Sequence, residues 1–367
     1  MKGPCWLRRG MLILWLSASV VVSSVAQQTA SPRPAVPLDP VTTIIDAFRT
    51  HSLVGLGEGT HGGEQDLAFR RLLIRDPRFA ATVNDIVVEG GNSLYQDVMD
   101  RFVAGSDVPD NELRQVWENG PVADTQADSP VYEAFYRAVR EVNAALPKEK
   151  HLRVLLSEPP LDWNGVQTFA DLLKWGDQRD TYAADLVRRE VLAKRRRALI
   201  VYGLMHFQRQ NERVNYEMAD FLTGLLERDG TTKMFTVWTV GRAHTDLRSL
   251  QAEVGSWRLP ALAMLRGTTL GSVDFASYFT SDGRLAFRDG RVVPIAREQW
   301  RALRMEDQFD AVLYFGAPST ITIARLAPAR CLDQGYMQMR LKRMALVPGG
   351  EGQINQLKQY CAVQAGK

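Results

Sequence analysis

Residues 53 to 65, LVGLGEGTHGGEQ, constrain the fold of this chain more than any other stretch. The apolar residues 53 to 56 predict a short buried strand, and the glycine-rich residues 57 to 63 predict a tight loop after it. Glycines let the backbone turn sharply and let a ligand approach it. Glu58 and His61 therefore follow the carboxyl end of a strand, where open α/β sheets bind ligands. The alternative is a plain strand-to-helix turn whose histidine only caps a helix.

The same arrangement returns along the chain. Further strands are predicted over residues 85–91, 152–160, 198–206, 234–240 and 311–316, and helical patterns separate most of them. Alternating strands and helices predict an α/β fold with a mostly parallel central sheet flanked by helices. The carboxyl ends of such strands meet at one edge, so the polar residues there are expected to line a common cleft. These residues are Glu58, His61, Glu89, Glu158, His206 and His244.

Composition and charge limit the class of protein. The chain has 367 residues, of which 45% are hydrophobic and 24% charged, enough for one large domain or two modest ones. Composition does not shift after residue 40, which favours a single domain over 41–367. The net charge of +3 is small and its basic residues are interleaved with acidic ones, so neither nucleic acid nor a membrane surface is indicated. A small-molecule substrate is the expected partner, and nothing indicates the oligomeric state.

The N-terminus has the pattern of a signal peptide over residues 1–26. Arg8 and Arg9 precede the apolar run 11–22, and small residues lie before position 27, where cleavage is expected. A retained anchor is the alternative, but the run is shorter than the ~20 apolar residues that cross a bilayer. We therefore expect export to a periplasmic or secreted location without stable membrane association. The proline-rich residues 27–40 predict a linker.

Two cysteines, Cys331 and Cys361, remain after the signal. In an oxidising compartment such a pair predicts a disulfide, which would tie the C-terminal segment to the body of the protein. Closing this loop of about 30 residues contributes roughly 3–4 kcal/mol to the free energy of unfolding by the chain-entropy relation. Two free buried thiols are the alternative.

Arg70 has two interpretations. It lies on a helix predicted over residues 64–74, nine positions after His61, with leucines 67, 72 and 73 expected to face inward. The helix pattern alone favours a solvated charge beside Arg71. The second interpretation is a guanidinium turned back toward the loop, where it would hold a carboxylate or an oxyanion.

Together these positions resemble a known family. A Gly-Glu-x-x-His-Gly loop after a strand, an arginine nine residues later and a glutamate ending the next strand resemble the erythromycin esterase-like proteins; here they are Glu58, His61, Arg70 and Glu89. Residues 202–206, YGLMH, resemble a later strand end of the wider superfamily, which includes Tiki- and TraB-type proteins and ChaN-type haem-binding lipoproteins. The resemblance covers about residues 53–207.

The resemblance implies a hydrolase with its cleft at the strand ends. On that basis His61 would be the general base toward a water molecule, Glu58 and Glu89 would orient it, and Arg70 would steady the carboxylates. His206 would bind the substrate carbonyl or share in proton transfer. The macrolide esterases carry paired histidines near this late position, whereas His206 stands alone.

Two further residues complete the expected cleft. Glu158 and His244 are expected to contact the substrate, and His244 is the candidate partner for the lone His206. The expected reaction is hydrolysis of an ester, a lactone or an amide. No GxSxG motif occurs, which argues against a serine hydrolase, and paired cysteines argue against a thiol nucleophile.

Two alternatives stay open at this point. A divalent ion such as Zn²⁺ or Mn²⁺, held by Glu58, His61, Glu89 and His206, would lower the pKa of bound water to ~7; the cofactor is therefore either such a metal or none. The non-enzymatic alternative is a ChaN-type protein that binds haem or another ligand without turnover. Its axial ligand would be Tyr202, His206 or His244. The converging acids favour water activation, because haem ligation does not need them.

Overall fold

The computed structural model describes residues 31–120, 129–210, 221–241, 248–275, 285–288, 291–294 and 302–365. From Pro32 onward they belong to one compact unit. The predicted signal peptide and His244 lie outside the described residues, so both remain predictions. Within these ranges, no helix combines the length and the apolar character that a bilayer crossing needs.

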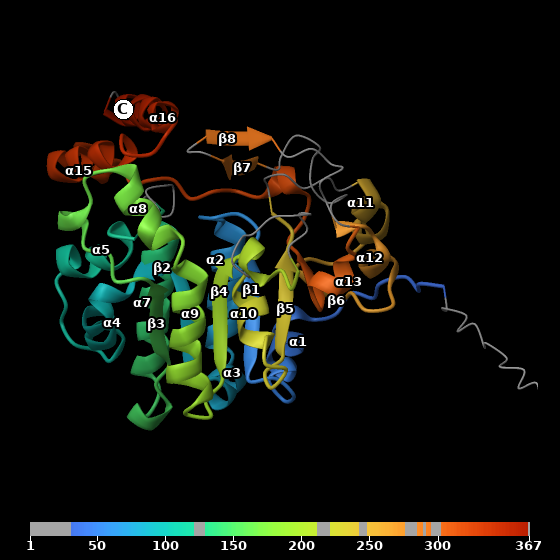
Figure 1. The fold of residues 1–367 in the computed structure, drawn as a ribbon. Helices are drawn as coiled ribbons and strands as arrows, with labels where there is room; N and C mark the ends of the chain where they lie inside the picture. The colour runs from blue at the N-terminus through green and yellow to red at the C-terminus, as the bar shows by residue number, and fades with distance from the viewer. Residues whose placement is uncertain are drawn as a thin grey trace, which may run out of the picture. The chain divides into compact units, whose positions relative to one another are not determined.

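The fold is built on a seven-stranded sheet in the order β3-β2-β4-β1-β5-β9-β6 (Figure 1). All neighbouring strands are parallel except β6, which pairs antiparallel with β9 at the edge. This confirms the predicted α/β fold with a mostly parallel sheet. The strands are β1 Leu53–Glu58, β2 Asp85–Asn92, β3 Arg153–Glu158, β4 Ala198–Gly203, β5 Met234–Thr239, β6 Ala261–Met264 and β9 Ala311–Tyr314. A separate antiparallel pair is formed by β7 Leu285–Arg288 and β8 Arg291–Pro294.

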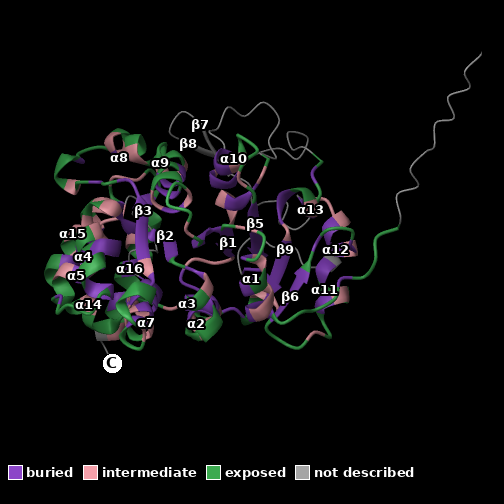
Figure 2. Ribbon diagram, turned by 90° about the horizontal axis from the view of Figure 1, so that it is seen from below, coloured by how far each residue is buried: buried purple, intermediate pink, exposed green. Residues whose placement is uncertain are grey.

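Both faces of the sheet are covered, which is why its strands are almost continuously apolar. Side chains alternate between the faces: in β1, Leu53 packs on one face while Val54 and Leu56 pack on the other. Figure 2 shows the resulting buried strands between layers of partly exposed helices. One face is covered by α1 Pro40–Ala47, α2 Glu64–Arg75, α3 Pro77–Thr82, α4 Gln96–Val103, α5 Asp110–Glu118 and α7 Pro130–Ala144; the other by α9 Arg179–Val187, α10 Leu222–Glu227, α11 Arg248–Val254, α12 Thr269–Ser272 and α13 Met305–Gln308.

A C-terminal helical segment, which sequence patterns did not predict, follows the sheet. It consists of α14 Pro328–Leu332, α15 Gln334–Met344 and α16 Gly350–Ala365. The disulfide Cys331–Cys361 joins α14 to α16 across a Cα–Cα distance of 5.2 Å, which confirms the predicted pairing. A small apolar cluster, formed by Leu326, Tyr336, Met344 and Leu357, supports the disulfide.

Three local features differ from the sequence expectations. Ala35 is buried and the Leu38 amide donates to Leu262 at 2.7 Å, so this part of the predicted linker runs along the edge strand. In α2, Leu72 is 56% exposed, and Phe69 and Arg70 face inward instead. Residues 178–194 have a continuous helical pattern, but α9 gives way to a π turn over Arg188–Leu192.

Candidate functional site

Three buried carboxylates meet at the carboxyl edge of the sheet. Glu58 ends β1, Glu158 ends β3, and Glu89 lies near the end of β2; each is at most 5% exposed. Glu58 lies beside Gly203, the last residue of β4, in the parallel register. The structure therefore brings together the acids that the sequence placed at separate strand ends.

Glu58 is held as a carboxylate by groups from two helices and its own loop. Its Oε1 lies 2.8 Å from Arg70 Nη2, in an ion pair without the alignment of a hydrogen bond. Its Oε2 accepts from His61 Nδ1 at 2.9 Å and from the Tyr132 hydroxyl at 3.1 Å. Burial opposes the charge, but Arg70 and the His61 hydrogen bond outweigh it and hold the pKa of Glu58 below its usual value.

The position of Arg70 decides between its two interpretations. The helix pattern alone favoured a solvated charge, whereas the side chain is 2% exposed and pairs with Glu58. Its guanidinium also lies 5.4 Å from the centre of the Phe135 ring. The second interpretation, a guanidinium turned back toward the loop, describes the observed position.

His61 has one nitrogen on Glu58 and a ring that reaches the surface. Because Glu58 is ionised, it accepts the proton on Nδ1, so in the neutral ring Nε2 is the nitrogen able to accept a proton. The side chain is 33% exposed and lines an open hollow of about 970 Å³. Residues 322–326 and α16, the helix that the disulfide holds, also line this hollow.

Glu89 and Glu158 share one arginine, Arg179, at the start of α9. Arg179 Nη2 lies 2.6 Å from Glu89 Oε1, and its Nε donates to both oxygens of Glu158 at 2.8 Å. The Gly203 amide donates to Glu89 Oε2 at 2.6 Å. Although burial opposes ionisation, His61, His206 and Arg179 hold the pKa of Glu89 well below its usual range.

Glu158 and His206 sit deeper than His61. Glu158 is 1% exposed, and burial outweighs Arg179 and raises the pKa of its carboxyl group. His206 Nδ1 lies 2.6 Å from Asp180 Oδ1 and Nε2 lies 3.5 Å from Glu89 Oε1. Burial disfavours its charge, but Asp180 and Glu89 raise the pKa of His206 to about 10. The ring is therefore a cation at neutral pH and supports Glu89 rather than accepting a proton.

A pH dependence of stability follows from His206. Its folded pKa, about 10, lies above its ordinary value of 6.5, so its contribution is complete below pH 6.5 and is lost as pH rises toward 10. We predict that the melting temperature of the wild-type protein falls more steeply between pH 7 and 10 than that of His206→Gln, which does not titrate there. Parallel curves for the two proteins would contradict this ion-pair assignment.

Several contacting residues were missed by sequence reasoning. The charged helical pattern of residues 178–194 is typical of a solvated face, yet Arg179 and Asp180 are 18% and 17% exposed and bind Glu89, Glu158 and His206. Both lie in the first turn of α9, and this position was the one signal that could have placed them near the strand ends. Neither Tyr132 nor Asp66 carried any pattern that could have identified it.

Asp66 is a second buried carboxyl group near Glu58. It is 6% exposed, and its burial outweighs the nearby Arg70 and raises its pKa to about 7. The Arg70 side chain also donates from Nε to the Asp66 carbonyl oxygen at 3.2 Å. Asp66 therefore exchanges a proton near neutrality without facing the hollow.

Two of the three candidate haem ligands lie in buried polar contacts. The Tyr202 hydroxyl is 2.6 Å from Ser157 Oγ, and Tyr202 is fully buried. His206 has both nitrogens on carboxylates. Neither side chain presents a ligand atom to the hollow, and His244 lies outside the described residues.

Gly203 is the position where a side chain would disturb the site most directly. A Cβ there would lie 3.1 Å from His61 Cε1, 3.2 Å from His61 Nε2 and 3.4 Å from Glu89 Oε2. The ring would have to move by a few tenths of an ångström, and catalytic groups tolerate such displacement poorly.

We therefore predict that Gly203→Ala lowers any activity of this site by about tenfold or more, with a small loss of stability. The matched control is Gly176→Ala at the end of α8 (Phe169–Gly176), where an added Cβ meets no atom within 4 Å. Activity assays of both variants make the comparison. Equal activity in the two would show that the His61 ring has room to move.

A metal ion fits the spacing of the site, where it would compete with donors already present. One ligand atom from each of Glu58, His61 and Glu89 lies within 4.8 Å of the others. However, each carboxylate oxygen of the two acids already has a partner: Arg70, His61 with Tyr132, Arg179, and the Gly203 amide. A cation would share these oxygens with their present donors and would lie beside the charges of Arg70 and Arg179, which would repel it.

Fold and site define an open α/β protein with arginine-held carboxylates and a partly exposed histidine at the carboxyl edge of its sheet.

No family model matches the chain, and no curated protein matches it either. Among solved structures, a Bacillus cereus protein is 12% identical, with 80% of this chain and 97% of that chain covered at a TM-score of 0.50. A succinoglycan biosynthesis protein is 10% identical, covering 80% and 96% at 0.51.

An erythromycin esterase, EreC, is also among the matches, at 12% identity, 78% and 94% coverage and a TM-score of 0.46. At such identities a likeness concerns the fold alone. The fold is therefore shared with the first two of these structures, and the activity has to be argued from the site.

Proposed function

We propose that this protein is an exported hydrolase in which His61 activates water for attack on an ester, lactone or amide carbonyl. The observation that carries the proposal is the buried, ionised Glu58 on His61 Nδ1, with the ring exposed to the hollow. A carboxylate in this position fixes the tautomer and stabilises the imidazolium that forms when the other nitrogen takes a proton.

The proposed reaction has two proton transfers. His61 Nε2 accepts a proton from water as the water oxygen attacks the carbonyl carbon. The resulting imidazolium, stabilised by Glu58, then gives that proton to the leaving oxygen or nitrogen as its bond to carbon breaks. Glu89, held by Arg179 and the Gly203 amide, lies within 4.8 Å of the His61 ligand atom and orients the water.

The hollow supports a small organic substrate. Its volume of about 970 Å³ is in the range of small-molecule sites. The walls mix aliphatic side chains and neutral amides with a cation, Arg325, and such a surface suits an uncharged or weakly anionic ester. Ile323, Leu357, Gln353 and Gln356 are among the neutral residues. The disulfide that holds α16 is consistent with an oxidising compartment and so with export.

The proposal is tested by assaying the purified protein against p-nitrophenyl esters of increasing chain length and a set of aliphatic lactones. We expect hydrolysis of at least one member of the panel, unchanged within about twofold after dialysis against EDTA, because the acids are already bonded. Activity that disappears with EDTA and returns with Zn²⁺ or Mn²⁺ would replace the metal-free mechanism. A folded protein that hydrolyses none of the panel would contradict the hydrolase assignment for these substrates.

A further inference from the structure

The edge of the sheet opposite His61 carries a concentration of basic residues, here called the basic edge: Lys148, Lys150, Arg153, Arg195, Arg196 and Arg197. These residues precede β3 and β4 or lie at their first positions, so they belong to the amino ends of the strands. They line two open hollows of about 500 Å³ and 240 Å³. Asn84 and Arg196 line both hollows, so the two adjoin.

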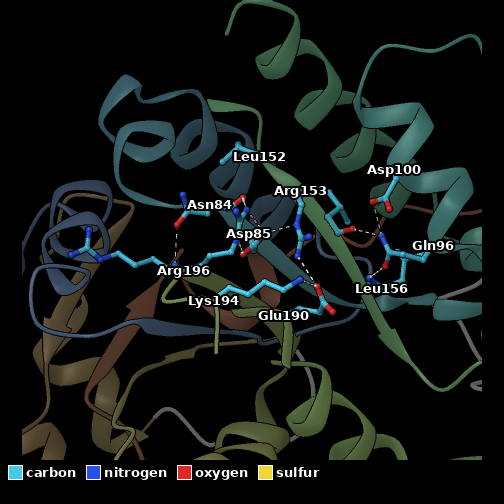
Figure 3. A network of polar contacts seen from close by, with 12 residues as sticks. Asn84, Asp85, Gln96, Asp100, Leu152, Arg153, Leu156, Glu190, Lys194 and Arg196 are labelled. Carbon is cyan, nitrogen blue, oxygen red and sulfur yellow. Dashed lines mark hydrogen bonds and ion pairs between the residues drawn. The ribbon is translucent and has the colours of Figure 1, made fainter. Parts of the chain in front are cut away.

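Asp85 holds two of these arginines in place. Its side chain is fully buried, Arg153 Nε donates to Oδ1 at 2.9 Å, and Arg196 donates to both oxygens at 2.6 and 2.7 Å (Figure 3). Glu190 adds contacts to Arg153 at 3.4 Å and to Lys194 at 2.6 Å. Arg153 and Arg196 are therefore held in fixed positions, and their charges are partly balanced by Asp85 and Glu190.

The other four cations of the basic edge have no such acidic partners within the described ranges. Within the described ranges, no ion pair involves Arg195, Arg197, Lys148 or Lys150, and Glu149 is the one acid among the residues lining the two hollows. The small net charge of the whole chain, +3, conceals this local surplus. Like charges held together on one surface repel one another, so the arrangement favours an anionic ligand.

The backbone at Arg195 supports the same conclusion. Arg195 has φ 53° and, within the described ranges, is the one residue other than glycine in the left-handed region. Glycine is the usual residue at such a position after a helix, and a side chain there costs roughly 1 kcal/mol or more. Attraction to helix C-terminal carbonyls would explain a cation here. It does not explain Lys148 and Lys150, which come from a separate turn, η2 (Lys148–Lys150).

We propose that the basic edge binds a molecule carrying two or more phosphoryl groups. A guanidinium group can donate two parallel hydrogen bonds to two oxygens of one phosphate, and a lysine adds a compact positive charge beside it. Ser52, Thr82 and Asn84 line the larger hollow and supply neutral donors beside the arginines. Because the two hollows adjoin and each contains cations, the site can hold more than one phosphoryl group. This site is separate from the His61 hollow and does not depend on hydrolase activity.

Calorimetric titration with inorganic tripolyphosphate at low salt tests the proposal. We expect saturable binding that weakens as salt increases, and a dissociation constant about tenfold or more higher for Arg195→Ala/Arg197→Ala. The matched control is Arg258→Ala/Arg266→Ala, which removes the same charge from exposed sites near the far edge of the sheet and should bind within about twofold of wild type. Unchanged melting temperatures would show that both variants fold. No binding by wild type, or equal weakening in both variants, would overturn the proposal.

Vesicles distinguish the source of the phosphoryl groups. Retention on vesicles of phosphatidylglycerol with phosphatidylcholine, but not on phosphatidylcholine alone, and loss of retention in Arg195→Ala/Arg197→Ala would assign clustered lipid headgroups. Tripolyphosphate binding without vesicle retention would assign a soluble phosphorylated molecule. If Arg195→Ala/Arg197→Ala and Arg258→Ala/Arg266→Ala lose vesicle retention equally, the effect is one of general charge and the proposed site is contradicted.

Discussion

His61→Asn is expected to lower kcat for the ester hydrolysed best by about 10²- to 10⁴-fold, the usual contribution of a general base. Asparagine retains a polar side chain next to Glu58 but has no nitrogen that accepts a proton from water. The ring is partly exposed at the hollow and is not part of the apolar core, so the melting temperature should change by only a few degrees. Steady-state kinetics and a thermal melt measure both quantities.

The matched control is His51→Asn, a partly buried histidine that precedes β1 at the opposite edge of the sheet. It should leave kcat within about twofold, because it contacts no group of the site. A His61→Asn variant with full activity would show that another group activates the water.

Arg70→Met is expected to lower the free energy of unfolding by about 3–5 kcal/mol, the usual cost of removing one partner of a buried ion pair. Arg70 and Glu58 are 2% and 5% exposed, so the remaining carboxylate would lose its cation without gaining water. Urea unfolding at pH 7 measures the change. Activity should fall as well, because Glu58 would no longer be held as the anion that orients His61.

Arg75→Met on the same helix is the matched control. Its pair with Glu141 is 44% and 61% exposed, so its loss should cost under about 1 kcal/mol. The double variant Arg70→Met/Glu58→Gln should recover part of the stability, because it no longer buries an unpaired charge. If Arg70→Met and Arg75→Met are equally stable, the buried pair contributes nothing.

The acids and the histidine of the site could be predicted because their positions are set locally. Glu58 and Glu89 are marked by the apolar run before them and the glycines after them. A parallel sheet then brings strand ends to one edge whatever the packing of the helices. The fold class and the meeting of these residues followed from that rule alone.

The groups that hold the acids could not be predicted in the same way. Arg70 and Arg179 lie on charged helices, and which helical face turns inward depends on tertiary packing, of α2 against α7 and of α9 against β3. Their burial is explained only once Glu58 and Glu89 are known to lie opposite them. The wall formed by α16 is another such case, since no local pattern connects it with His61.

The electrostatics of the site give its residues different tasks. Glu58 orients His61, whereas Glu89 is held between Arg179, the Gly203 amide and His206. With the pKa of His206 raised to about 10, the ring remains a donor at neutral pH. The proposed mechanism therefore gives the proton transfer to His61 and not to His206.

Chemical rescue of His61→Ala by added imidazole tests the central claim most directly. The side chain lines an open hollow, so imidazole can reach the space that the ring leaves. If His61 is the general base, hydrolysis by His61→Ala should rise with the concentration of neutral imidazole and fall when imidazole is protonated. Glu58→Gln in the same background should weaken the rescue, because Glu58 would no longer orient the added ring. An inactive, folded His61→Ala protein that imidazole does not rescue, or one that hydrolyses the ester at the wild-type rate without it, would contradict the assignment.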